Sequence, residues 1–199
     1  SSGGPTADGR IKPDVVAMGT SVYSVYPGFK NSDSYVYANG TSFSCPLVAG
    51  VCALLLEAHP ELGTYDVREA LRSTADNNDS PDNRFGWGIV DSYEAVFFHG
   101  MICTDYLLER TPATRFRFAC RVLAAENVTH TTVTLYVRNK AEQDFSEITM
   151  SRTGSVSGRH ECILPAHIVI EDARFYIETA DVEGEIDRAP FSAPEQVYS

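Results

Sequence analysis

One stretch decides the fold of the first half of this 199-residue chain: Gly40-Thr41-Ser42-Phe43-Ser44-Cys45-Pro46. An apolar run follows it, from residue 47 to residue 56. Proline is tolerated in the first turn of a helix, where its missing N–H loses no partner, so the stretch predicts a helix that begins near Ser42. We expect Gly40 to let the backbone turn sharply into this helix. Because the predicted helix is apolar nearly all round, we expect it to run through the middle of a layered domain.

The place of Ser42 at this helix start gives the stretch a chemical meaning. A helix N-terminus offers unpaired N–H donors and the positive end of the helix dipole. An alkoxide or tetrahedral oxyanion formed there is stabilised, and the backbone N–H of Ser42 can be one of its donors. The competing interpretation is that Ser42 only caps a helix, which is the commoner role of a serine at this position. Because of its place among these donors, Ser42 is the candidate nucleophile. Gly40, Thr41 and Pro46 are the residues of the stretch that support this assignment.

Further blocks of sequence continue the pattern on both sides of Ser42. The central block is Asn39-Gly40-Thr41-Ser42-x-x-x-Pro46-x-Val48-Ala49-Gly50, and the others are Ser2-Gly3-Gly4-Pro5-x-x-Asp8-Gly9-Arg10-x-Lys12-Pro13-Asp14-Val15-Val16-Ala17-x-Gly19, then Ala53-Leu54-Leu55-Leu56, His59-Pro60-Glu61-Leu62, Val67-Arg68-x-Ala70-Leu71, Thr74-Ala75 and Gly86-Trp87-Gly88-Ile89-Val90-Asp91. In this order and spacing they cover about residues 1–97 and resemble the subtilase family of serine endopeptidases. The resemblance implies an α/β fold with a layered parallel sheet, and peptide hydrolysis through an acyl-enzyme on Ser42.

The other members of the catalytic triad are expected upstream of this chain. In the family the nucleophile follows the aspartate and the histidine in sequence, and the oxyanion asparagine also precedes it. No His-Gly-Thr helix start precedes Ser42, and the chain begins with Ser1. The sequence therefore predicts the C-terminal piece of a longer protease, inactive by itself, whose expected partners are a polypeptide substrate and the missing N-terminal part of the same chain. His99 is predicted to be a linker histidine and not the missing base.

Composition excludes several other classes of function. The formal net charge of −11 argues against a nucleic-acid partner. No apolar run reaches the about 18 residues that a membrane helix needs, so no membrane span is expected. The spacing of His130, His160 and His167 suggests no metal cluster. The acidic loop 76–84 is expected to be solvated, with a calcium site as the weaker alternative. We expect no metal and no other cofactor.

Shorter elements are expected on either side of the central helix. Residues 15–17 are short, apolar and bounded by proline and glycine, which is typical of a strand buried in a parallel sheet. Residues 22–37 are predicted to form two extended pieces joined by a turn at Pro27-Gly28. Thr64 and Ser92 are the expected N-caps of two further helices.

After Gly100 the apolar periodicity changes from 3.6 to 2, which predicts strands. The alternating segments are 116–122, 132–137, 145–150, 159–164 and 173–180. Their length and spacing predict an all-β sandwich. This half resembles the immunoglobulin-like or fibronectin type III-like domains appended to secreted bacterial proteases, which implies a secreted or cell-surface protein of bacterial type. We therefore expect two domains, 1–98 and 99–199.

Two alternatives stay open at this point. The parent protein could be a pseudoprotease, or a binding module whose sandwich holds substrate, cell wall or partner, and the sandwich could also simply brace the protease domain. Cys120 and Cys162 are expected on neighbouring strands of one sheet, pointing into the core. A disulfide between them is possible if their registers coincide. Two free buried thiols are the favoured alternative, because an offset of one pair separates the sulfurs.

Overall fold

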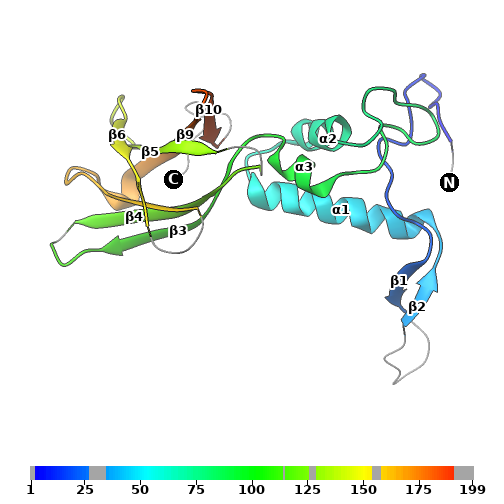
Figure 1. Ribbon diagram of the computed structural model, residues 1–199, viewed down its shortest axis with the longest axis horizontal. Helices are drawn as coiled ribbons and strands as arrows, with labels where there is room; N and C mark the ends of the chain where they lie inside the picture. Colours follow the sequence, from blue (N-terminus) through cyan, green and yellow to red (C-terminus); the bar gives the residue numbers. More distant parts are fainter. Residues whose placement is uncertain (1–2, 27–34, 114, 126–128, 154–157, 191–199) are drawn as a thin grey trace. The chain divides into compact units, whose positions relative to one another are not determined.

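The structure, a computed structural model, describes residues 3–26, 35–113, 115–125, 129–153 and 158–190. The chain divides into two compact units, Ser1–Phe98 and His99–Ser199. Each unit is built differently, the first around helices and the second from antiparallel strands (Figure 1).

The first unit consists of three helices and one hairpin. The helices are α1 (Thr41–Ala58), α2 (Thr64–Ser73) and α3 (Ser92–Phe97), and the hairpin pairs β1 (Val22–Val25) with β2 (Tyr35–Ala38). The three helices lie side by side (Figure 1), and they pack on one small core of Val51, Leu55, Leu62, Ala70, Leu71 and Ala95. The two extended pieces predicted for 22–37 are confirmed, while the predicted Pro27-Gly28 turn lies outside the described residues.

Helix α1 confirms the predicted helix, with a correction to the place of its proline. The helix begins at Thr41, so Pro46 is its sixth residue and lies beyond the first turn. An N–H at position 46 would donate to the carbonyl of Ser42, four residues earlier, and proline removes that bond. The backbone carbonyl of Ser42, the candidate nucleophile, therefore lacks this helical hydrogen bond.

Helix α1 is less buried than its sequence predicts. Only Val51 and Leu55 are buried, whereas Leu47 is 46%, Leu54 50% and Leu56 43% exposed. The described residues therefore do not supply the layers on both sides of the helix that the expectation requires, and it stays a prediction. By length and composition alone α1 could also cross a membrane, a test that the core helix of a soluble protein passes as well.

Three local expectations in the first unit need correction. Residues 15–17 do not form a strand, since Val16 makes only an isolated parallel bridge with Ile89. Among the described strands every pairing is antiparallel, so the expected parallel sheet is not seen in this part of the chain. The N-cap of α2 is Gly63 instead of Thr64. The N-cap of α3 is Asp91, whose carboxylate accepts two backbone N–H groups, instead of Ser92.

The second unit consists of two antiparallel four-stranded sheets. One has the order β3-β4-β8-β7 and the other β10-β9-β5-β6. Their bounds are β3 (Ile102–Arg110), β4 (Phe116–Leu123), β5 (His130–Asn139), β6 (Ser146–Thr149), β7 (Ser151–Arg152), β8 (Arg159–Ile163), β9 (Ala173–Asp181) and β10 (Ile186–Ala189), with a short 3-10 helix over Ile170–Asp172. The predicted alternating segments fall on β4, β5, β6, β8 and β9.

Both sheets contribute to one core. Alternate residues of β4 (Phe118, Cys120, Val122) and of β5 (Val133, Leu135, Val137) are buried in the same cluster, together with Ile177 of β9. Period-2 alternation puts successive side chains on opposite faces of a strand, which is why one apolar set per strand reaches this core. The two sheets therefore pack face to face around a shared interior.

The cysteines of this core lie on paired strands but are not bonded to each other. Strand β4 pairs with β8, as predicted, with Cys162 opposite Phe118 and Cys120 opposite His160. The two thiols are thus offset by two residues, and neither is in a disulfide. The free-thiol alternative is confirmed for this structure.

Candidate active site

The nucleophile turn is built by the chain leaving β2 and entering α1. Gly40 is the N-cap of the helix with φ 152° and ψ 151°, a conformation that favours glycine over every residue with a Cβ. Its N–H donates to the carbonyl of Gly19 at 2.7 Å, and its own carbonyl accepts the N–H of Phe43 at 3.0 Å. Ser42 is therefore the second residue of the helix, with its side chain exposed.

The helix start presents an electropositive surface. No side chain caps α1, and no acidic residue stands in its first turn. The N–H groups of a first helical turn have no partner within the helix, and the dipole adds about half a positive charge there. An oxyanion that forms next to Ser42 would meet these groups, so the turn has the electrostatics that acyl transfer requires.

A neighbouring segment of the chain contacts this turn through hydrogen bonds. Besides the Gly19–Gly40 bond, the N–H of Ser21 donates to the side-chain oxygen of Asn39 at 2.6 Å. A Cβ placed on Gly19 would come within 2.5 Å of the hydroxyl oxygen of Ser44 and within 3.1 Å of the carbonyl oxygen of Gly40. The segment and the start of α1 are thus in close contact, and a larger residue at position 19 would require Ser44 or the Gly40 carbonyl to shift.

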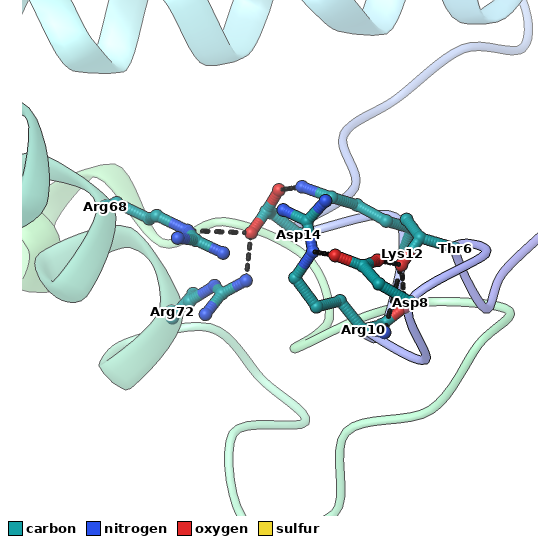
Figure 2. A network of polar contacts seen from close by, with 7 residues as sticks. All are labelled: Thr6, Asp8, Arg10, Lys12, Asp14, Arg68 and Arg72. Carbon is teal, nitrogen blue, oxygen red and sulfur yellow. Dashed lines mark hydrogen bonds and ion pairs between the residues drawn. The ribbon is translucent and has the colours of Figure 1, made fainter.

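The other end of the same segment carries a cluster of charges around Asp14 (Figure 2). The carboxylate of Asp14 accepts hydrogen bonds from Lys12, Arg68 and Arg72. Partial burial acts to raise the pKa of Asp14, but the hydrogen bonds from the three cations outweigh it and lower the pKa to about 2. The guanidinium of Arg72 also lies 3.7 Å from the centre of the Trp87 ring.

This cluster was not expected from the sequence, although a signal was present. Arg68 and Arg72 are four residues apart, so they share one face of α2. Two like charges at that spacing repel one another unless an anion lies between them, and such a pair therefore indicates an acidic partner. The partner itself could not be identified from the sequence because Asp14 is more than fifty residues away.

The structure brings no histidine to Ser42 within the first unit. The one histidine of residues 1–98, His59, stands at the opposite end of α1, 17 residues on, or about 25 Å along the helix axis. Its ring is buried, and Nε2 lies 3.1 Å from the carbonyl oxygen of Val96. Its backbone N–H donates to the carbonyl of Leu55 at 2.8 Å.

The acidic loop 76–84 uses its carboxylates for local backbone contacts. Asp82 accepts the N–H groups of Arg84 and Phe85, both at 2.7 Å, and Asp76 accepts that of Ile89 at 2.7 Å. In the described part of the chain no group of three or more His, Cys, Asp or Glu residues is placed to hold a metal ion.

Comparison with known proteins finds similarity to one family in the stretch that contains this turn. Residues 1–88, which include Ser42, match the sequence model of the Subtilase family. The chain is 35% identical to bacillopeptidase F of Bacillus subtilis (strain 168) over 99 residues, which is 47% of this chain and 7% of that protein. It is 32% identical to serine protease AprX of the same strain over 107 residues, which is 48% of this chain and 24% of that protein.

A third relative gives the highest identity of the three over the shortest stretch. The chain is 48% identical to subtilisin DY of Bacillus licheniformis over 64 residues, which is 32% of this chain and 22% of that protein. The chain thus spans less than a quarter of the length of each of these three relatives. About half of the chain or less is thus similar to part of each of these proteases.

Proposed function

We propose that residues 1–98 are the C-terminal portion of the catalytic domain of a subtilisin-like serine endopeptidase, with Ser42 as its nucleophile. One observation carries the proposal. Ser42 is exposed at the uncapped start of an apolar helix, on a turn shaped by Gly40, within the stretch that matches the Subtilase family. A serine that only capped the helix would occupy the N-cap position, and that position belongs to Gly40.

The geometry supports a defined role for each group. The hydroxyl of Ser42 attacks the scissile carbonyl carbon, and a histidine supplied by the upstream part of the protein takes its proton. The carbonyl oxygen then carries the negative charge and lies at the positive end of α1, where the Ser42 N–H donates to it. Collapse of this intermediate releases the amine and leaves an acyl-enzyme on Ser42, which water hydrolyses.

The expected partner of this unit is the upstream part of the same protein. It would supply the aspartate, the histidine and the oxyanion asparagine, together with the strands of a layered parallel sheet. Leu47 and Leu54 of α1 are exposed and seven residues apart on one face of the helix, which is the surface that such strands would cover. The three relatives, each at least four times longer than the matched part, are consistent with a substantial missing portion.

A binding role for the second unit is the alternative function, and one observation favours it. An apolar pocket of about 600 Å³ opens between the two sheets. Its aromatic lining residues, Tyr106, Phe118 and Phe175, contact one another with ring centroids 5.1 to 6.2 Å apart. Pockets of this size and lining bind small apolar groups. We propose an immunoglobulin-like or fibronectin type III-like module in a secreted protein, which would hold substrate or a partner even if the protease were inactive.

Labelling with a fluorophosphonate probe tests the nucleophile. The probe is applied to the protein extended by its upstream segment, and the label is expected on Ser42 and absent from Ser42→Ala. Ser44→Ala is the matched control, since it removes a hydroxyl two residues away and is expected to keep the label. A label on another serine, or one that survives Ser42→Ala, would refute the assignment. No label at all on the extended protein would favour the pseudoprotease.

A further inference from the structure

The carboxylate of Asp14 joins two segments of the first unit that are far apart in sequence. It accepts from Lys12 within its own segment and from two residues of α2, with the Nε of Arg68 at 3.0 Å and Arg72 as the third donor. Figure 2 shows both arginine side chains reaching this one carboxylate. The Asp14 side chain is 30% exposed, so water screens these pairs less than it screens an ion pair on the open surface.

The backbone at and after Asp14 is also held by hydrogen bonds to residues 87–90. Its carbonyl accepts the N–H of Trp87 at 2.9 Å. Two residues on, Val16 donates to Gly88 at 2.8 Å and accepts from Val90 at 3.1 Å. Arg72 therefore fixes this segment twice, through the Asp14 carboxylate and through its stacking on Trp87.

The far end of the segment touches the nucleophile turn. Residues 14–19 run from the charge cluster to Gly19, whose carbonyl holds the N–H of Gly40 at 2.7 Å. Five residues of chain span at most about 17 Å when fully extended. The contact at Gly19 is close, since a Cβ there would lie 2.5 Å from the Ser44 hydroxyl oxygen and 3.1 Å from the Gly40 carbonyl oxygen. A shift of the segment at Asp14 is thus transmitted to the start of α1.

We propose that Asp14 is a positioning residue for Ser42, which sets the place of the nucleophile turn by fixing segment 14–19 against α2. The proposal rests on the proposed function of Ser42. Asp14 acts through the backbone of the segment and takes no part in the bond-making step. Since misplacement of a reacting group by about 1 Å costs about 100-fold in rate, loss of this anchor is expected to lower the rate of acylation and to leave substrate binding nearly unchanged.

The test compares Asp14→Asn with Asp8→Asn in the protein extended by its upstream segment. Asp8 is the matched control because it pairs with Arg10 in the same loop but is 62% exposed and makes no contact with α2 in the described network. Asp14→Asn is expected to lower kcat and the rate of fluorophosphonate labelling by about 10- to 100-fold, with KM changed less than about twofold. Asp8→Asn is expected to leave all three quantities unchanged.

Two further measurements keep the proposal open to refutation. Arg68→Gln removes only one of the three donors, so it is expected to lower the labelling rate in the same direction but less, even if Asp14→Asn does not fold. Hydrogen exchange of the amides of residues 39–44 does not depend on activity, and it is expected to speed up in Asp14→Asn relative to Asp8→Asn. Equal labelling rates, or equal exchange, in the two variants would overturn the positioning role. An extended wild-type protein without turnover would instead refute the proposed function, and the exchange measurement would still decide the role of Asp14.

Discussion

The two units differ in how completely they bury their own apolar side chains. In residues 99–199, both sheets share one core in which Leu135 and Ile177 have no exposed surface. In residues 1–98, the most apolar helix of the chain buries only Val51 and Leu55 and leaves three leucines at least 43% exposed. Burial of apolar surface is the main source of folding free energy. The second unit thus carries its own core, whereas we expect the first to need apolar partners that its described residues do not supply.

The largest expected effect is a separation of the two units in folding. Residues 99–199 alone are expected to unfold in one cooperative thermal transition, and residues 1–98 alone are expected to show none. The single tryptophan of the chain, Trp87, lies in the first unit, so its fluorescence reports on that unit only. Circular dichroism follows the strands of the second. A cooperative transition for 1–98, with none for 99–199, would reverse the comparison.

A matched pair of leucine substitutions sharpens the same comparison. Leu135→Ala removes a side chain with no exposed surface and is expected to lower the free energy of unfolding of the second unit by about 2–5 kcal/mol. Leu54→Ala removes a side chain that is 50% exposed and is expected to change the urea unfolding of the 199-residue chain by less than about 0.5 kcal/mol. A large loss from Leu54→Ala would mean that α1 is packed within this chain.

The sequence predicts the parts of this molecule that local pattern determines. Alternate residues of β4 (Phe118, Cys120, Val122) and of β5 (Val133, Leu135, Val137) are buried, and both strands were expected. Strand β3 was not, because its register shifts between Thr104 and Leu107, where Asp105 adopts a positive φ of 52° and breaks the alternation. Strand β10 was also missed, since its four residues are too few to show a period.

The candidate site also has one part that the sequence predicts and one part that it does not. The Ser42 turn could be found because its glycine, serine and proline lie within seven residues of sequence. The anchor at Asp14 could not, because its partners in α2 are 54 and 58 residues away and only the folded chain brings them together. The caps of α2 and α3 were each placed one residue late, since Gly63 and Asp91 compete with an adjacent threonine and serine. Local chemistry was thus predictable, and long-range pairing was not.

Two histidines make the second unit sensitive to pH. Burial lowers the pKa of His130 below its usual 6.5 against the opposing pull of Asp187 and Asp181, and burial also lowers the pKa of His160, with Arg152 adding to the effect. At a pH between the lowered pKa values and 6.5, these histidines bind protons in the unfolded chain but not in the folded unit. The free energy of unfolding of the second unit therefore falls as the pH falls below about 6.5.

Urea unfolding at pH 7.5, 6.5 and 5.5 measures this effect. The double variant His130→Gln/His160→Gln is expected to flatten the dependence in that window, which lies above the range where carboxylates titrate. His167→Gln, at an exposed histidine of the same unit, is the control and is expected to keep the wild-type slope. A slope that is unchanged in the double variant would assign the pH dependence to other groups.

The smallest expected effect is that of a reducing agent on the second unit. Cys120 and Cys162 are buried and unbonded, and their offset of two residues across β4 and β8 keeps them from facing each other directly. Burial, with smaller contributions from Cys120 and Glu161, raises the pKa of Cys162 to about 12, so its reactive thiolate is scarce at neutral pH. A disulfide between the two would close a loop of about 40 residues and add about 3–4 kcal/mol in the chain-entropy model.

We expect instead that the melting temperature of residues 99–199 is the same with and without reductant, and that both thiols resist alkylation in the folded unit but are alkylated fully in urea. Mass spectrometry of non-reduced peptides decides the matter, because a cross-linked Cys120–Cys162 peptide in high yield would show that the strands shift to bring the sulfurs together.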